Sequence, residues 1–313
     1  MNKAFIFPGQ GSQTIGMGKD FYDAFESARE VFHEVDEALK YKLSKIIFEG
    51  PEADLTSTVN TQPALMTTSI AIVRTLLKES GKTTAKLCNI AAGHSLGEYS
   101  ALCAADSLNL SDTARLLKIR STSMQEACPE GVGAMAACIG IDLAKLENII
   151  KNATSTGVCE VANDNITGQI VISGHAENID RVIAILKDLG YKAIKLKVSA
   201  PFHCKLMQPA ESKMAEALAA VNINSPSVPI LANVTAEKTT TPNEIRSNLI
   251  AQICGRVRWR ETLDVFASLG ITEIVEIGSG KVLAGLARKS GHEFQVFNIS
   301  NTAELEEYLK HIS

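Results

Sequence analysis

The sequence has little of what marks several functional classes. Aromatic residues make up only 5% of its 313 positions. No uninterrupted apolar run reaches the roughly 18 residues of a membrane-spanning helix. The apolar stretch before Pro8 is too short for a signal peptide. The formal net charge of −4 lacks the basic excess of a nucleic-acid-binding protein. We therefore expect a cytoplasmic protein that binds neither membrane nor nucleic acid.

Cysteine and glycine patterns argue against three further kinds of site. The seven cysteines contain no C-x-x-C pair, which favours reduced thiols over a disulfide framework or a zinc site. Gly18-Lys19 and Gly280-Lys281 lack the other residues of a phosphate-binding loop, and no dinucleotide-binding G-x-G-x-x-G occurs. The sequence thus predicts a globular protein that needs no metal and no cofactor.

The most informative stretch is residues 93–97, G-H-S-L-G. It follows an apolar run at 87–92 that predicts a buried strand, and it precedes a predicted helix at 98–105. Strand, G-x-S-x-G and helix form the nucleophile elbow, a turn that lifts a serine hydroxyl clear of the sheet. Ser95 is therefore a candidate nucleophile, and the N–H of Leu96 is a candidate donor to an oxyanion. An ordinary glycine turn with an exposed serine is the alternative.

An arginine on a later predicted helix is the second signal. At 100° per residue, Arg120 falls within an apolar arc about 100° wide, whereas Arg115 lies on the opposite side. The other members of the arc are Leu116, Leu117 and Met124. A guanidinium that points into a core needs an anionic partner. That partner is either an internal carboxylate or the carboxylate of a ligand held by two hydrogen bonds.

The order of predicted elements changes near residue 130. Residues 130–199 predict β-α-β-β-α-β, the order of a ferredoxin-like unit, with a turn at 163–168. Strands alternate with helices on either side, which predicts an α/β fold. We expect a large α/β-hydrolase-like domain with a parallel sheet from residues 1–129 and 200–313. A small ferredoxin-like α+β domain at 130–199 would be inserted in it, with a cleft between the two.

Two local expectations concern the helices before the insertion. A core helix is predicted over residues 64–79, directly after Pro63. A second helix is predicted to begin at Ser111, which would serve as its N-cap.

His203 is the best-placed candidate base. It stands just past the last predicted strand of the small domain, at the junction of the two domains. A lone histidine is more often structural, but a histidine at a cleft in a chain that carries an elbow favours a base. The glycine-rich loop at residues 8–13 adds backbone N–H groups that an oxyanion hole could use.

Several motifs together resemble one family, in their order and spacing. They are F-P-G-Q-G-S-Q at 7–13, T-Q-P-A at 61–64, G-H-S-L-G-E-Y-S-A at 93–101, Arg120, P-F-H at 201–203 and G-K-V-L at 280–283. The family is the malonyl-CoA:acyl carrier protein transacylases of bacterial type II fatty acid synthesis. The resemblance implies malonyl transfer from malonyl-CoA to the phosphopantetheine thiol of holo acyl carrier protein, through a malonyl-serine intermediate in a ping-pong reaction. Coenzyme A thioester would be a substrate and not a cofactor.

The resemblance also implies roles for single residues. They are Ser95 as nucleophile, His203 as base, Arg120 as the group that binds the free malonyl carboxylate, the N–H groups of Gln10 and Leu96 as oxyanion hole, and the backbone carbonyl of Gln252 as the group that orients His203. Asn163 and Asn165 would lie near the mouth of the cleft. An acidic carrier protein would need a basic surface, for which the candidates are Arg256, Arg258, Arg260, Lys281, Arg288 and Lys289.

Three other functions share parts of this pattern. A serine hydrolase, such as a thioesterase, has the same elbow but uses water as acceptor and has no need of Arg120. A non-catalytic module that binds carrier protein would never be acylated at Ser95. A transacylase for another acyl chain would keep every motif, because the shape of the pocket decides which acyl group fits.

Overall fold

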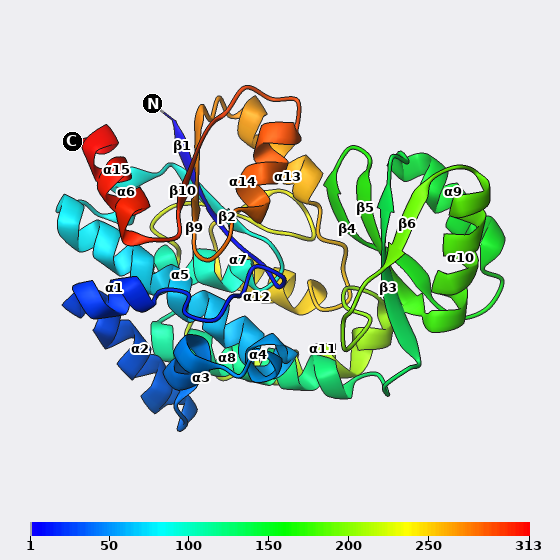
Figure 1. Cartoon of the computed structure of the whole chain (residues 1–313), viewed down its shortest axis with the longest axis horizontal. Helices are drawn as coiled ribbons and strands as arrows, with labels where there is room; N and C mark the ends of the chain where they lie inside the picture. The colour runs from blue at the N-terminus through cyan, green and yellow to red at the C-terminus, as the bar shows by residue number, and fades with distance from the viewer. Residues whose placement is uncertain (1) are drawn as a thin grey trace.

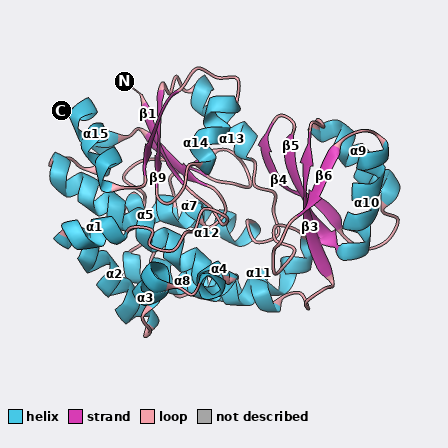
Figure 2. Ribbon diagram, viewed as in Figure 1, coloured by secondary structure: helices cyan, strands magenta, loops and turns pink. Residues whose placement is uncertain are grey.

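The computed structural model describes residues 2–313, which fold into two lobes that each contain one sheet (Figures 1 and 2). The larger lobe holds both termini and a six-stranded sheet of order β10-β9-β1-β2-β7-β8. The smaller lobe holds a four-stranded sheet of order β4-β5-β3-β6. The predicted fold class, a large α/β part with a parallel sheet and a small α+β part, is confirmed.

The large sheet is parallel except at one edge. β1 (Lys3–Phe7) pairs in parallel with β2 (Ile90–Gly93) and with β9 (Glu273–Ile277). β10 (Gln295–Ile299) and β7 (Ile230–Leu231) extend it in parallel, and β8 (Lys238–Thr239) closes it as an antiparallel edge. Helices on both faces bury the central strands, so these read as continuous apolar runs. β10, whose residues are mostly half-buried, was not predicted from the sequence.

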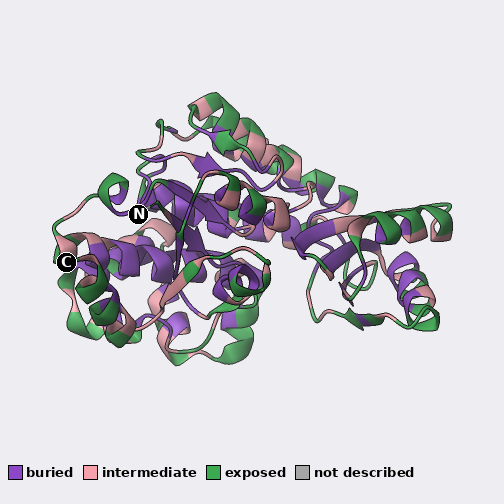
Figure 3. Ribbon diagram, turned by 90° about the horizontal axis from the view of Figure 1, so that it is seen from above, coloured by how far each residue is buried: buried purple, intermediate pink, exposed green. Residues whose placement is uncertain are grey.

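Helices make up most of the large lobe. Their bounds are α1 (Lys19–Ala24), α2 (Glu26–Leu39), α3 (Leu43–Glu49), α4 (Glu52–Thr56), α5 (Thr58–Ser80), α6 (Thr84–Leu87), α7 (Gly97–Ala104), α8 (Leu110–Glu126), α11 (Gln208–Ala219, after a 3₁₀ turn), α12 (Pro242–Ala251), α13 (Trp259–Ser268), α14 (Val282–Lys289) and α15 (Thr302–Ile312). Figure 3 shows the buried positions on the sheet and on the inner helix faces. Within residues 2–313, no helix combines the length and the apolar character that a membrane crossing requires.

Two helix starts differ from the prediction. α5 begins at Thr58, upstream of Pro63, although a proline inside a helix removes one N–H donor. The Val59 carbonyl, which that N–H would have bonded, accepts a hydrogen bond from the Ser121 hydroxyl at 3.3 Å. The N-cap of α8 is Asn109 and not Ser111, because the Asn109 side chain accepts the N–H of Asp112 at 2.7 Å.

The small lobe has its own apolar core. Its elements are β3 (Gly133–Ile139), α9 (Leu143–Ala153), β4 (Cys159–Ile166), β5 (Gln169–His175), α10 (Ala176–Asp188) and β6 (Lys192–Lys195). The four strands pair antiparallel. The turn predicted at 163–168 is confined to residues 167–168, because β4 continues to Ile166. Two register shifts after Val161 and after Asp164 let this polar stretch remain in the strand.

β4 also fastens the small lobe to the large one. The N–H of Val257 donates to the Ala162 carbonyl at 2.8 Å, and the N–H of Asp164 donates to the Val257 carbonyl at 2.9 Å. The Arg260 guanidinium lies 2.9 Å from the Asp164 carboxylate, whose side chain is 1% exposed. The domain boundaries at 129/130 and 199/200 stay a prediction.

Candidate active site

The turn between β2 and α7 places Ser95 at the carboxyl end of the parallel sheet. Ser95 has a φ of 55°, in the left-handed region that non-glycine residues rarely adopt. A Cβ on Gly93 would lie 1.9 Å from the Gly97 carbonyl carbon, and one on Gly97 would lie 2.3 Å from the Phe7 carbonyl oxygen. Glycine is therefore required on both sides of Ser95, since any larger residue collides with backbone atoms.

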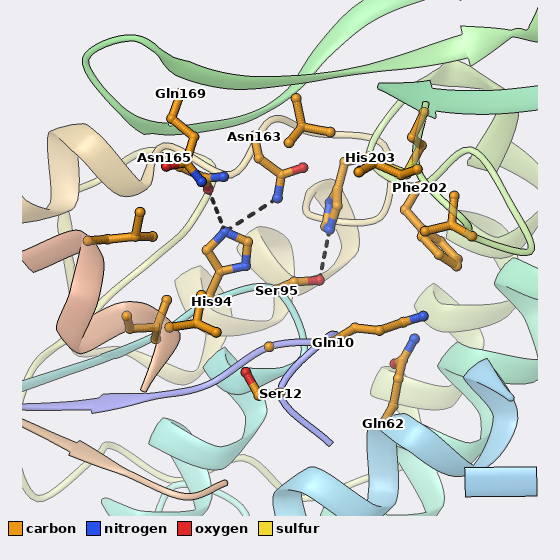
Figure 4. A pocket seen from close by; sticks show the side chains of 18 of the residues that line it. Gln10, Ser12, Gln62, His94, Ser95, Asn163, Asn165, Gln169, Phe202 and His203 are labelled. Carbon is orange, nitrogen blue, oxygen red and sulfur yellow. Dashed lines mark hydrogen bonds between the residues drawn. The ribbon is translucent and has the colours of Figure 1, made fainter. Parts of the chain in front are cut away.

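Ser95 precedes the small lobe in the sequence and His203 follows it, and the fold brings the two side chains together. The Ser95 Oγ lies 2.8 Å from His203 Nε2 (Figure 4). On the other side of the ring, Nδ1 lies 3.0 Å from the Gln252 carbonyl oxygen and 3.2 Å from that of Gly255. Because carbonyl oxygens only accept, Nδ1 carries the proton and Nε2 is free to accept one. The ring is thus oriented by main-chain carbonyls and by no carboxylate.

The surroundings keep His203 neutral. Its side chain is buried, and burial lowers its pKa to about 3, with the positive charge of Arg120 as the next cause. Since neutral imidazole is the form that accepts a proton, His203 has the protonation state of a base throughout the neutral pH range.

Arg120 lies beside this pair and is 1% exposed. Its Nη1 donates to Gln62 Oε1 at 2.7 Å, and its Nη2 donates to Ser95 Oγ at 3.1 Å and to Gln252 Oε1 at 2.9 Å. These partners are two amides and a hydroxyl, so none of them neutralises the charge. Its Nε is buried with no partner among residues 2–313. Burial lowers the pKa of Arg120, as expected for a guanidinium without a counter-ion in contact.

The two candidate oxyanion donors come from two different loops beside the serine. Leu96 immediately precedes α7, and Gln10 lies on the loop after β1. That loop presses on the elbow, since a Cβ on Gly9 would lie 2.7 Å from the His94 carbonyl oxygen. Among the hydrogen bonds recorded within residues 2–313, none uses the backbone N–H of Gln10 or of Leu96 as donor. Both N–H groups are thus available to a ligand oxygen.

A cavity of about 210 Å³ opens over these groups, between the lobes. Its base is polar and includes Ser95, His203 and Arg120, whereas an apolar wall is formed by Met124, Met135, Val171, Leu196, Val198 and Phe202. Asn163 and Asn165 line it from β4. His94 faces these two asparagines and lies outside the Ser95–His203 pair, because its Nε2 is 2.9 Å from Asn165 Oδ1 and 3.3 Å from Asn163 Nδ2 (Figure 4).

Three polar residues of the site were not found by sequence analysis. Gln62 accepts a hydrogen bond from Arg120, and Asn233 accepts one from the N–H of Ser95. Glu98 in turn accepts the backbone N–H of Asn233. Gln62 sits within the T-Q-P-A motif, which was a usable signal. Asn233 carries no local signal, because its bond to Ser95 spans 138 positions. Burial raises the pKa of Glu98 to about 7.

Most of the candidate basic surface is neutralised within the chain. Four of its six side chains lie near acidic groups: Arg256 near Glu147, Arg258 near Glu261, Arg260 near Asp164 and Lys281 near Glu304. That these six residues form a docking surface for an acidic carrier protein stays a prediction.

Among residues 2–313, no group of three or more His, Cys, Asp or Glu side chains is arranged to hold a metal ion.

Comparisons with known proteins agree with this geometry. The model of the acyl transferase domain matches residues 4–303. The malonyl CoA-acyl carrier protein transacylase of Bacillus subtilis (strain 168) is 44% identical over 305 residues, which cover 97% of this chain and 95% of that protein. That of Escherichia coli (strain K12) is 42% identical over 91% of this chain and 92% of its own.

Solved structures show the same similarity over the whole fold. The acyl-carrier-protein-S-malonyltransferase of Bartonella henselae has a TM-score of 0.97 and 48% identity, covering 100% of this chain and 99% of its own. A malonyl-transacylase solved in complex with its type II PKS acyl-carrier protein has a TM-score of 0.95 and 37% identity, covering 99% and 100%. This chain is an acyltransferase, and it belongs to the malonyl CoA-acyl carrier protein transacylase family.

Proposed function

We propose that this enzyme transfers a malonyl group from malonyl-CoA to the phosphopantetheine thiol of holo acyl carrier protein, through a malonyl ester on Ser95. The observation that carries the proposal is the placement of Arg120. Its buried guanidinium lies 3.1 Å from Ser95 Oγ and has no carboxylate among its hydrogen-bond partners. A malonyl group attached to Ser95 would bring its free carboxylate to this charge.

In the first half-reaction, His203 Nε2 takes the proton of Ser95 Oγ while Oγ attacks the thioester carbonyl carbon. The N–H groups of Gln10 and Leu96 stabilise the negative oxygen that forms. The C–S bond then breaks, and coenzyme A leaves as a thiol with the proton that His203 held. The malonyl group remains as an ester on Ser95.

The second half-reaction reverses these steps with another thiol. His203 Nε2 takes the proton of the phosphopantetheine thiol, and the sulfur attacks the ester carbonyl carbon. The C–O bond breaks, and Ser95 Oγ recovers the proton from His203. No cofactor takes part in this scheme, and each substrate enters after the previous product has left, which is ping-pong kinetics.

Two similarities support the carrier protein as acceptor. The relatives bear the name malonyl CoA-acyl carrier protein transacylase, and one relative was solved with an acyl-carrier protein bound. A hydrolase would transfer the same acyl group to water. An acyltransferase of another specificity would use the same groups with a different fit to the apolar wall of the cleft.

Intact-protein mass spectrometry tests the proposal. The native enzyme and Ser95→Ala are each mixed with malonyl-CoA and, separately, with acetyl-CoA. We expect a malonyl adduct on the native enzyme alone, and we expect holo acyl carrier protein to remove it as malonyl carrier protein. Free malonate without a persistent adduct would indicate a hydrolase. An adduct that Ser95→Ala also forms would refute the assigned nucleophile.

A further inference from the structure

Glu98 is a buried acid that contacts the supports of the catalytic groups and not the groups themselves. It lies in the first turn of α7 and is 3% exposed. One of its oxygens, Oε2, accepts the backbone N–H of Asn233 at 2.9 Å and the side-chain Nε2 of Gln252 at 2.8 Å. Burial of a carboxylate costs free energy. The residues that Glu98 binds therefore indicate its role.

Asn233 connects Glu98 to the elbow. Its Oδ1 accepts the N–H of Ser95 at 2.7 Å, and its Nδ2 donates to the Gly93 carbonyl at 2.7 Å. The Asn233 side chain thus binds two backbone groups of the strained turn, one at Ser95 and one at Gly93. Because Glu98 binds the main chain of Asn233, it fixes the point from which that side chain reaches the elbow.

Gln252 connects Glu98 to the base and to the arginine. Its Nε2 also donates to the Ser95 carbonyl at 3.0 Å, and its Oε1 accepts from Arg120 at 2.9 Å. Its own carbonyl accepts from His203 Nδ1 at 3.0 Å. Each of the three functional groups is therefore one residue away from the Glu98 carboxylate.

Two other buried glutamates have purely structural hydrogen bonds. Glu276 accepts the N–H groups of Leu283 and Ala284 at the start of α14, which stabilises that helix end. Glu273 binds Tyr308 and His311 of α15 and so attaches that helix to β9. The hydrogen bonds of Glu98 go instead to residues outside its own helix that hold reacting groups.

We propose that Glu98 is a positioning residue, which acts through Asn233 and Gln252 to fix Ser95, His203 and Arg120 relative to one another. The inference rests on the proposed acylation of Ser95. Both hydrogen bonds end on the same oxygen, so the neutral amide of Glu98→Gln can accept both. The carboxylate of Glu98→Asp keeps the charge but is one methylene too short to reach both donors. The two variants therefore separate the effect of the hydrogen-bond geometry at position 98 from the effect of its charge.

The experiment compares native enzyme with E98Q, E98D and a control, E273Q. Rapid quenching and intact mass spectrometry give the rate and the half-saturating concentration for acylation of Ser95 by malonyl-CoA and by acetyl-CoA. Melting temperatures are measured alongside. We expect E98Q to keep a rate close to the native one. We expect E98D to lose about 10²-fold in maximal rate with both acyl groups, as for a misplacement of about 1 Å.

In E98D we also expect the half-saturating concentrations of the two substrates to change differently. Its half-saturating concentration should rise for malonyl-CoA and stay unchanged for acetyl-CoA, because only malonyl uses Arg120. E273Q should melt at a lower temperature and acylate normally, as a purely structural acid would. E98D that acylates like the native enzyme, or E98Q that is folded and slower than E98D, would overturn the inference.

Two further results keep the test decisive. If E98D does not fold, Asn233→Ala replaces it, with an expected loss of maximal rate for both acyl groups and no change in the half-saturating concentration of malonyl-CoA. An unchanged maximal rate in Asn233→Ala would overturn the inference. Absence of any adduct on the native enzyme would refute the proposed function instead, which is a distinguishable outcome.

Discussion

Replacement of Arg120 by alanine should remove the preference for malonyl over acetyl groups. The guanidinium is 1% exposed, so a malonyl carboxylate bound to it is shielded from water. Loss of one partner of such a buried pair costs about 3–5 kcal/mol, which is roughly 10²- to 10⁴-fold in the specificity constant for acylation by malonyl-CoA. Acetyl-CoA loses only the effect of the hydrogen bond from Arg120 to Ser95 Oγ, worth about 1 kcal/mol or about fivefold.

The assay is the rate of adduct formation on Ser95 at a series of acyl-CoA concentrations. Arg115→Ala is the matched control, because Arg115 lies on the same helix with its side chain 51% exposed and paired with Asp112. That variant should acylate like the native enzyme with either substrate. An equal loss with malonyl-CoA and acetyl-CoA in Arg120→Ala would refute the assignment, since it would show that Arg120 supports the nucleophile and not the carboxylate.

Four more outcomes follow from the structure. Because burial lowers the pKa of His203 to about 3, far below the ordinary 6.5, the acylation rate in brief pH jumps should stay nearly constant between about pH 7 and pH 5. The same shift means that the unfolded chain binds a proton at His203 that the folded chain does not, so the contribution of His203 to stability should fall as the pH drops below 6.5, while the raised pKa of about 7 at Glu98 contributes with the opposite sign. Gly97→Ala should abolish the adduct and lower the melting temperature, because its Cβ would lie 2.3 Å from a β1 carbonyl oxygen; Gly285→Ala in α14, where nothing lies within 4 Å, should not destabilise the protein. Tyr308→Phe removes a 2.9 Å hydrogen bond to the buried Glu273 and should lower the free energy of unfolding in urea by about 1–3 kcal/mol without affecting acylation.

Local rules were enough for the parts of the site that depend on neighbouring residues. The elbow around Ser95 was predictable, because strand, tight turn and helix are consecutive and only glycine fits beside the serine. The inward direction of Arg120 followed from helical periodicity. The roles of Gln10 and Gln252 came from family resemblance alone, since neither residue type nor spacing indicates which backbone group faces the cleft.

The remainder depends on contacts between distant segments. Asn233 reaches Ser95 across 138 positions, and no pattern in the sequence encodes that approach. The polar run at Asn163 looked like a turn because its strand character comes from pairing with β5 and from a bridge to Val257. β10 was missed because its half-buried residues do not alternate clearly between apolar and polar.

The order of strands in the large sheet has a consequence for synthesis of the protein. Ala4 pairs with Ile90 on one side and with Ile274 on the other. At about 5–20 residues per second, a ribosome needs roughly ten to fifty seconds between making the first and the last of these residues. During that interval β1 leaves the exit tunnel with one edge unpaired, whereas the small lobe, contiguous from Gly133 to Lys195, already has all four strands. The strands of the inserted lobe are therefore complete first, and the sheet that carries Ser95 closes only near the end of translation.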